Sequence, residues 1–178
     1  MSAPRPGGEM DAITCIHTRR SIRKFEKRTV GDDLIKQVLE AGMMAPSAGN
    51  QQPWHFLVVT DPALLARIPE VHPYAGMAPE AAFAVLVCGD LQLEKHRGFW
   101  VQDCSAAVQN MLLAAHALGL GGVWTGIYPN EERASGFRRL FNLPEHVVPL
   151  ALLPFGHPAQ KSERADRFRP ERIHKNKW

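Results

Sequence analysis

Hydrophobic and polar residues follow two different periods along the chain, which predicts a mixture of helices and strands. Apolar residues spaced three and four apart predict amphipathic helices over 30–44 and 131–141, with shorter helices over 10–18 and 63–68. Short apolar runs predict strands over 54–60, 82–88, 123–126 and 147–155. Because helices and strands do not alternate strictly, the pattern favours an α+β fold, a small sheet with helices packed on it.

Residues 100–120 predict the longest helix, and apolar residues lie on nearly all of its sides. Such a helix is typically buried, so we expect it to be the central helix of the core. Asp103 then needs a hydrogen-bonding partner, because an unpaired buried polar group is costly. We interpret Asp103 first as a structural contact and second as a functional group.

Prolines modify the prediction in two places. Pro149 and Pro154 interrupt the last strand, and proline has no N–H to donate to a neighbour, so this strand is expected at an edge or with irregular pairing. The segment 69–79 contains Pro, Gly, His and Tyr, and it is predicted to be a mobile loop over or near a site.

Length and composition favour one soluble domain. The chain has 178 residues, of which 45% are hydrophobic, and its Pro/Gly-rich residues 1–9 are expected to be a disordered leader before a single domain over 10–178. No signal peptide or membrane-spanning run is evident, so a cytoplasmic protein is expected. The net charge of +3 is too weak to imply nucleic acid.

The cysteines and histidines show no pattern of a redox or metal site. Cys15, Cys88 and Cys104 are scattered and odd in number, which indicates small buried thiols more than a disulfide framework or a nucleophile. The eight histidines have no ligand spacing with each other or with Cys or Asp, so no metal site is predicted.

Two stretches combine residue types that could bind a ligand. Residues 45–54 (Ala-Pro-Ser-Ala-Gly-Asn-Gln-Gln-Pro-Trp) bring amides and a hydroxyl beside an aromatic ring. This combination could bind a flat ligand with polar edges, or it could be a helix-to-strand connector made of turn-forming residues. Residues 19–25 hold four basic side chains and a serine, which suits a phosphate group or a solvated charged turn. From the residues alone, both alternatives remain open for each stretch.

Motifs for several kinds of chemistry are missing from the sequence. The stretch 119–124 nearly matches GxGxxG, but Trp124 replaces the last glycine and a helix precedes it, so a Rossmann site is not expected. No Walker loop and no G-x-S-x-G elbow occur, and no pair of carboxylates stands out for glycosidase or aspartyl chemistry. If the protein is an enzyme, an organic cofactor is expected to carry the reaction.

Several ordered motifs together resemble the FMN-dependent nitroreductase family. They are Arg19-Arg20-Ser21-Ile22-Arg23-Lys24-Phe25, then Ala45 to Phe56, Gln102-Asp103 to Gly121, Trp124-Thr125-Gly126, Phe155-Gly156-His157-Pro158 and Arg172 to Trp178. The resemblance begins near residue 12 and reaches the C-terminus in the family's order. It implies a nitroreductase-like α+β fold, with a mostly antiparallel sheet, helices on both sides and a long buried central helix. It also implies an intertwined homodimer with two FMN molecules at the interface.

The resemblance assigns cofactor-binding roles by position. Arg19, Arg20, Ser21 and Arg23, together with Arg167, would hold the phosphate and ribityl chain of FMN. Pro46, Ser47, Asn50 and Gln51 of the other subunit would line the isoalloxazine ring, while Thr125 and Gly126 would bring backbone groups near its reactive edge. Trp124, Gly156 and Arg164 are further candidates. No catalytic side chain is expected beyond this flavin-binding set.

The resemblance further implies a ping-pong oxidoreductase. NAD(P)H would give hydride to flavin N5 and leave, and a nitroaromatic, quinone or related acceptor would then be reduced. Alternatives within the same fold are a flavin-binding redox or storage protein, or a dehalogenating, oxidising or flavin-destroying enzyme. Composition alone also allows a weakly basic interaction module.

Overall fold

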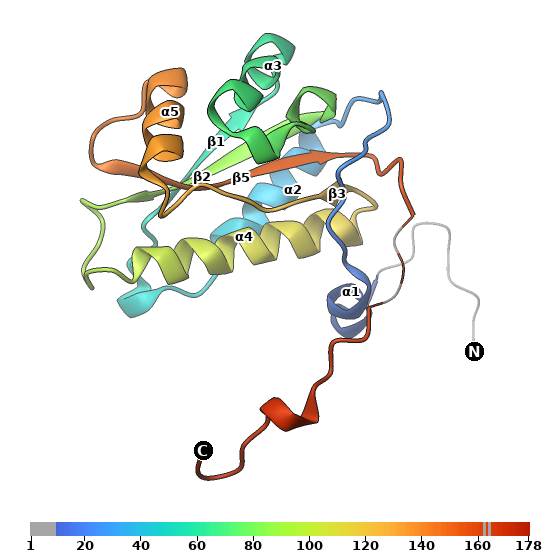
Figure 1. Ribbon diagram of the computed structural model, residues 1–178, viewed down its shortest axis with the longest axis vertical. Coiled ribbons are helices and arrows are strands. Elements are labelled where there is room, and N and C mark those ends of the chain that lie inside the picture. Colours follow the sequence, from blue (N-terminus) through green and yellow to red (C-terminus); the bar gives the residue numbers. More distant parts are fainter. Residues whose placement is uncertain (1–9, 162, 164) are drawn as a thin grey trace.

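The computed structural model of the protein describes residues 10–161, 163 and 165–178, so the predicted leader over 1–9 lies outside the described residues. In this part of the chain, one antiparallel sheet forms the centre of the fold (Figure 1). Its strands lie in the order β1 (Trp54–Val59), β2 (Phe83–Asp90), β5 (Val147–Gly156) and β3 (Gly121–Gly122). The two-residue strand β4 (Thr125–Gly126) also pairs with β5, beside β3.

Helices cover both faces of this sheet, as the α+β prediction requires. The helices are α1 (Ala12–Thr18), α2 (Asp32–Met43), α3 (Pro62–Val71), α4 (Trp100–Ala117) and α5 (Glu131–Phe141). Short 3-10 turns lie at η1 (Ala48–Asn50), η2 (Pro73–Ala75), η3 (Ala78–Glu80) and η4 (Pro170–Arg172). No helix in the described ranges is both long enough and apolar enough to cross a membrane.

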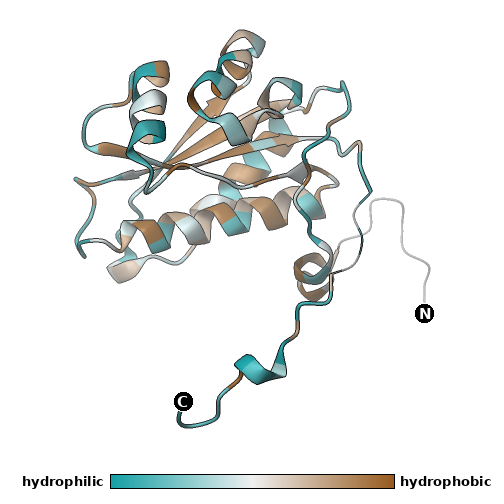
Figure 2. Ribbon diagram, in the orientation of Figure 1, coloured by the Kyte–Doolittle hydropathy of each residue, from teal (hydrophilic) through white to brown (hydrophobic). Residues whose placement is uncertain are grey.

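The alternation of side chains along β2 divides the core into two layers. Phe83, Val85 and Val87 belong to the cluster that contains α2 and α4, while Ala84 and Leu86 belong to the cluster that contains α3 and α5. This is the two-residue period of a strand buried on both faces. Figure 2 shows the strands as predominantly hydrophobic between the two helical layers.

Polar side chains set the helix beginnings that the sequence pattern predicts. Asp11 accepts hydrogen bonds from the backbone N–H groups of Ile13 and Thr14 at the start of α1. Asp61 caps α3 and Asn130 caps α5 in the same way. Each oxygen satisfies an N–H that has no partner within its own helix.

The prediction that the last strand lies at an edge is wrong, whereas the alternative of irregular pairing is confirmed. β5 lies inside the sheet, between β2 and the short strands β3 and β4. The register with β2 shifts between Val87 and Cys88, where Pro149 is the partner of Cys88. The missing N–H of Pro149 therefore coincides with an interruption of the ladder, where its loss is least disruptive.

The segment 69–79 is packed rather than an exposed loop. α3 continues through Pro69 to Val71, and the turns η2 and η3 follow. Ala75 and Ala78 have no exposed surface, and His72 is 1% exposed. Small side chains let these turns approach the sheet closely, so the segment belongs to the α3 and α5 layer.

The N-terminal basic segment crosses one end of the sheet. Ser21 forms a parallel bridge with Gly122, and the Ile22 N–H donates to the Gly122 carbonyl at 3.0 Å. The Gln160 side chain accepts from the backbone N–H groups of Arg23 and Lys24. These contacts place residues 19–24 between β3 and the beginning of the C-terminal segment.

Gly121 permits the close approach of this basic segment to β3. A Cβ atom at Gly121 would lie 2.7 Å from the Cβ of Ile22, whose β-branched side chain cannot easily move away. We expect Gly121→Ala to lower the free energy of unfolding by about 1–3 kcal/mol, the usual effect of overpacking. The change is measured by urea denaturation followed by circular dichroism.

Gly76→Ala is the matched control, because nothing lies within 4 Å of a Cβ atom at this position and its φ is −58°. It should change stability by no more than about 0.5 kcal/mol. Equal stability of the two variants would contradict the close packing of Ile22 on β3.

Candidate functional site

The loop after α2 is fixed by a buried carboxylate on the first turn of α4. Asp103 is 5% exposed. It accepts a hydrogen bond from the Ala48 N–H at 3.0 Å and from the Gln51 Nε2 at 2.6 Å. The structural interpretation of Asp103 is therefore confirmed, and the group that it holds in place is the loop singled out in the sequence.

The backbone of this loop adopts a conformation that is unfavourable for most residues. Gly49, Asn50 and Gln52 have φ values of +52°, +55° and +48°. The Ser47 Oγ accepts from the Gln52 N–H, and the Asn50 Oδ1 accepts from the Gln52 Nε2. Left-handed conformations persist where surrounding contacts hold them, and they concentrate at functional sites.

Gln51 differs in position from the other predicted residues of the loop. Its side chain is 6% exposed, and its Oε1 accepts from the backbone N–H groups of Lys95 and His96 at 2.7 and 2.9 Å. Gln51 thus joins the loop to both Asp103 and the segment before α4. Pro46 and Asn50 are exposed and Ser47 is half-buried, so these three line the surface of the loop.

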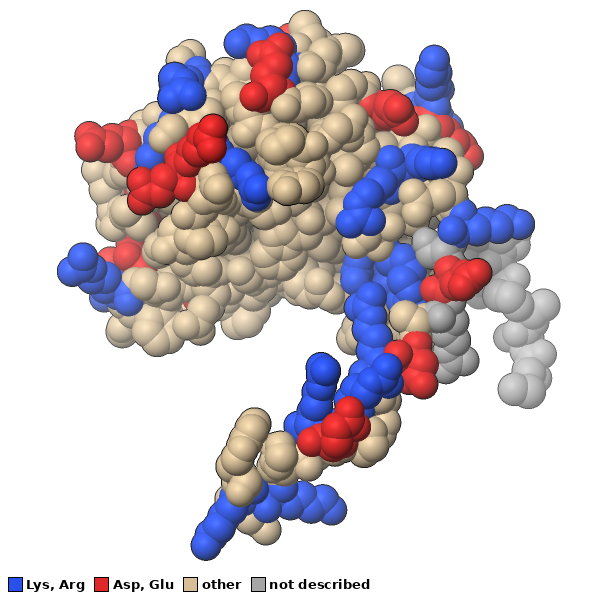
Figure 3. Space-filling view, in the orientation of Figure 1, with Lys and Arg blue, Asp and Glu red and all other residues tan. Residues whose placement is uncertain are grey.

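The predicted phosphate-binding residues lie at the other end of α4. Arg19, Arg20 and Arg167 line a surface hollow of about 670 Å³, with the aromatic and aliphatic side chains of Phe168 and Ile16. Figure 3 shows basic side chains gathered where the C-terminal segment leaves the body of the protein. Arg164 lies outside the described residues.

Arginines in this hollow are close enough to repel one another. Burial lowers the pKa of Arg19, and the charges of Arg167 and Arg20 lower it further. Arg20 directs its guanidinium to the backbone carbonyls of His17, Arg19 and Glu163. A cluster of arginines, of which Arg20 is held in place by backbone carbonyls, is a suitable receptor for an anion with several oxygens.

Ser21 and Arg23 flank the hollow along the chain. Ser21 is half-buried in its bridge to Gly122, and Arg23 is exposed, with its backbone N–H bound to Gln160. The structure therefore brings Arg19, Arg20 and Arg167 together, with Ser21 and Arg23 next to them.

The predicted residues on β4 and β5 have different surroundings. The Thr125 Oγ1 is buried and donates to the Leu152 carbonyl at 2.8 Å, whereas Trp124 is 38% exposed. Gly126 is exposed, and its carbonyl accepts from His72 and Arg133. Gly156 is buried, and a Cβ atom there would lie 3.0 Å from the Phe25 ring, so this glycine packs beneath the basic segment.

The two halves of the candidate site do not meet within one chain. Asp103 holds the loop at the first turn of α4, whereas His116 in the last turn contacts Thr18 of α1 at 2.8 Å. Thirteen residues of α-helix separate these anchors by about 20 Å. Figure 1 shows the loop before β1 and helix α1 at opposite ends of α4.

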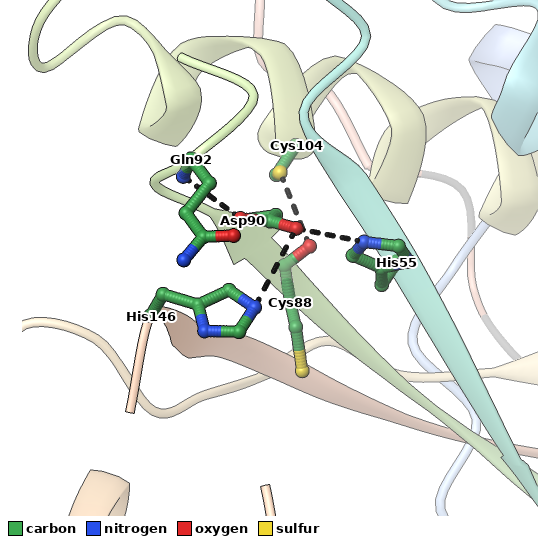
Figure 4. Close-up of polar contacts among 6 residues, drawn as sticks. All are labelled: His55, Cys88, Asp90, Gln92, Cys104 and His146. Carbon is green, nitrogen blue, oxygen red and sulfur yellow. Dashed lines mark hydrogen bonds and ion pairs between the residues drawn. The ribbon is translucent and has the colours of Figure 1, made fainter. Parts of the chain in front are cut away.

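A second polar cluster lies where β1 begins and β2 ends. The Asp90 Oδ2 is 3.1 Å from the His55 Nε2 and 3.9 Å from the His146 Nε2, and its Oδ1 accepts from the Gln92 N–H (Figure 4). Among the described residues, no group of three or more His, Cys, Asp or Glu side chains is arranged to hold a metal ion. These contacts join the beginning of β1 and the residue before β5 to the end of β2.

Sequence reasoning did not identify His72 and Arg133 as part of the site. His72 lies in a segment predicted to be a mobile loop. Arg133 lies in the first turn of α5, where its sequence position does not distinguish it from other surface cations. Their common partner is a backbone carbonyl, which no pattern of side chains could indicate. All three cysteines are buried and free, as predicted.

Comparisons with known proteins agree on one family. The family model described as "Nitroreductase family" matches residues 16–85 and 70–157. A protein of Methanothermobacter thermautotrophicus, named "Putative NADH dehydrogenase/NAD(P)H nitroreductase", is 55% identical over 170 residues, which cover 96% of this chain and 89% of the relative.

Solved structures with the same fold include one in complex with FMN and one in complex with NAD+. A nitroreductase-fold protein of Desulfovibrio desulfuricans, titled as "in complex with fmn", is 32% identical, has a TM-score of 0.81 and covers 99% of each chain. The NADPH:FMN oxidoreductase of Vibrio harveyi, solved with NAD+, is 27% identical with a TM-score of 0.82, covering 93% of this chain and 77% of that one. Because the family model and a 55% identical relative both span most of the sequence, the protein belongs to the nitroreductase family.

Proposed function

We propose that the protein is an FMN-dependent oxidoreductase that uses NAD(P)H to reduce nitroaromatics, quinones or related acceptors. The relatives named for NAD(P)H nitroreductase and NADPH:FMN oxidoreductase activity support the reaction class. The observation that carries the proposal is the arrangement along α4. An anion receptor lies at one end of the helix, and a conformationally fixed loop of amides lies at the other.

The cationic hollow fits the phosphate of FMN. A phosphate monoester carries between one and two negative charges at neutral pH and offers three acceptor oxygens. Arg19, Arg20 and Arg167 present donors and positive charge in one place, where burial has already lowered the pKa of Arg19. Bound phosphate would relieve their mutual repulsion, so this arrangement of arginines favours anion binding.

The loop fits the edge of a flavin ring. Asn50 is exposed beside Ser47, and the backbone is fixed by Asp103 and Gln51, so their donors need little reorganisation on binding. Gln51 would serve by holding the loop, because its own amide already has partners. Pro46 would add apolar surface to the same wall.

A homodimer would bring the loop of one subunit to the arginines of the other. Two features of the single chain support this assembly. The side of α4 away from the sheet is exposed or half-buried at Gln102, Ala106 and Gln109. The C-terminal segment also exposes large apolar groups, with Ile173 at 57% and Trp178 at 102% exposure. Surfaces of this kind mark protein interfaces.

The chain itself would orient the reactants and exclude competing chemistry. Burial raises the pKa of Cys88 to about 12 and also raises the pKa of Cys104, so neither thiol is a nucleophile at neutral pH. Bound FMN would supply the redox chemistry, accepting hydride from NAD(P)H and passing it to the acceptor.

The proposed function predicts a yellow protein whose flavin is reduced by a pyridine nucleotide. Under anaerobic conditions, NADH or NADPH should bleach the absorbance of the bound FMN, and a quinone or nitroaromatic should restore it. If dithionite bleaches the flavin but neither nucleotide does, the result would indicate a redox or storage protein. Purified protein that binds no flavin would contradict the proposal altogether.

The phosphate assignment predicts a change in the titration of His116. Burial lowers the pKa of His116, and the charges of Arg19 and Arg20 lower it further. Inorganic phosphate bound to flavin-free protein should offset those charges and raise the pKa of His116 toward its usual value. The measurement is an NMR titration with the resonance assigned by His116→Gln.

An Arg19→Gln/Arg20→Gln variant is the control, because phosphate should then leave the pKa of His116 unchanged. Sodium chloride at equal ionic strength separates specific binding from screening. An equal response of the native protein to both salts would contradict the phosphate assignment.

The composite site predicts complementation between two defective subunits. Arg20→Ala/Arg23→Ala removes phosphate donors, and Ser47→Ala/Asn50→Ala removes ring contacts. Loss of a hydrogen bond to a charged group costs about 1.5–3 kcal/mol, so the arginine variant should weaken FMN binding at least about tenfold. In a heterodimer of the two variants, one site would carry both lesions and the other neither.

Differently tagged chains allow the heterodimer to be purified and titrated with FMN. We expect one tight and one weak site per heterodimer, and only weak sites in each homodimer. Two equally weakened sites in the heterodimer would show that one subunit holds the whole cofactor. That result would overturn the shared site while leaving FMN binding itself intact.

A further inference from the structure

The backbone carbonyl of Gly126 in β4 accepts hydrogen bonds from two side chains of the layer that contains α3 and α5. The His72 Nε2 lies 3.0 Å from the Gly126 carbonyl oxygen, and the Arg133 Nη1 donates to the same oxygen at 3.1 Å. A carbonyl only accepts, so His72 carries its proton on Nε2. Burial and then the charge of Arg133 lower the pKa of His72, which keeps the ring neutral.

Both donors are themselves held in place. The His72 backbone N–H donates to the Ile68 carbonyl at the end of α3, and the ring packs edge-on against Phe137 of α5. The Arg133 guanidinium lies over the Tyr74 ring, 5.0 Å from its centroid. Groups from the end of α3 and from α5 therefore converge on one carbonyl of β4. The His72 Nδ1 has no hydrogen-bond partner among the described residues.

The peptide unit that carries this carbonyl is fixed at both ends. Its oxygen belongs to Gly126, and its N–H belongs to Ile127, which donates to the Leu150 carbonyl at 2.9 Å. Without the two side-chain donors, the hydrogen bond of the Ile127 N–H and the pairing of β4 with β5 would remain to oppose rotation of the peptide.

The orientation of such a peptide matters beside a flavin, because the hydrogen-bonding character of N5 changes on reduction. Oxidised flavin N5 accepts a hydrogen bond, whereas the reduced ring carries an N5–H that donates one. A carbonyl free to turn toward N5 would therefore stabilise the reduced form and raise the potential. A carbonyl held by other donors cannot do so.

We propose that His72 and Arg133 are positioning residues that hold the Gly126 carbonyl away from the flavin and so keep the reduction potential of bound FMN low. The inference rests on the proposed function, together with the position of Thr125 and Gly126 near the reactive edge of the ring that the family resemblance implies. A low potential would make the reduced protein a stronger donor to its acceptor. The packed segment 69–79 thereby acquires a role in tuning the cofactor.

The test compares a variant pair that loses both donors with a pair that keeps them. His72→Leu/Arg133→Met removes the donors with similar volumes, and His72→Gln/Arg133→Lys retains a donor at each position. In the first pair we expect the ratio of affinities for reduced over oxidised FMN to rise about tenfold. That corresponds to a midpoint potential about 30 mV less negative for a two-electron couple. The second pair should stay within about twofold of the native protein.

The sign of the change in reduction potential distinguishes loss of the positioned carbonyl from loss of the Arg133 charge. Loss of the Arg133 cation alone would disfavour the more negative reduced flavin and make the potential more negative. Spectroelectrochemistry gives the potential, and titration of flavin-free protein gives the affinity for oxidised FMN. An unchanged or more negative potential in the first pair would overturn the inference. Absence of FMN binding in the native protein would instead contradict the proposed function.

The carbonyl can also be observed without the cofactor. Gly126-Ile127 is the single Gly-Ile pair in the sequence, so ¹³C-carbonyl glycine with ¹⁵N-isoleucine gives one correlated NMR signal. In flavin-free protein, loss of both donors should move this carbonyl resonance upfield, while the conservative pair should leave it near its native position. If the double-loss pair fails to fold, the single variant Arg133→Met, at a half-buried position, should show a smaller upfield shift. An unmoved resonance in a folded variant would contradict the hydrogen bonds to Gly126.

Discussion

The length of α4 is the constraint on which the arrangement of the candidate site depends. One side of this helix is buried against the sheet and α2, so its position is fixed by the core. Its first turn holds the loop through Asp103, and its last turn contacts α1 through His116. A packed helix cannot bend to bring its ends together. In the proposed homodimer each chain would supply two half-sites, and cofactor binding would stabilise the association of the two chains.

The sequence predicted the elements whose signal is local. The periods of α4, α5 and β2 repeat over many residues, and their positions in the structure differ from the predictions by only a few residues. The position of β5 could not be predicted in this way. Proline reveals a missing N–H, but it does not reveal that β3 and β4, each two residues long, lie on the other side of the strand. Pairing partners are set by tertiary structure, and strands this short have no period of their own.

The same limit applies to the candidate site. The arginines of 19–23 and the amides of 45–54 stand out because neighbouring residues have a shared chemical character. The partners of these residues do not stand out, since Gln51 meets Lys95 and Asp103 across more than forty residues of chain. The segment 69–79 was misinterpreted for a related reason. Its Pro and Gly residues are typical of loops, but buried alanines and His72 fix it to the core.

Three titratable groups buried near β4 and in the core, His72, Cys88 and Cys104, are held in their neutral forms. Burial raises the pKa of the Cys88 and Cys104 thiols and lowers that of the His72 imidazole, so none of them gains a charge near neutral pH. What the fold provides instead is a set of oriented dipoles: the loop held by Asp103 and the peptide held by His72 and Arg133. Fixed dipoles act on a bound ring without reorganising during the reaction. In a protein whose chemistry resides in a cofactor, such peptides offer a way to adjust reactivity without a catalytic side chain.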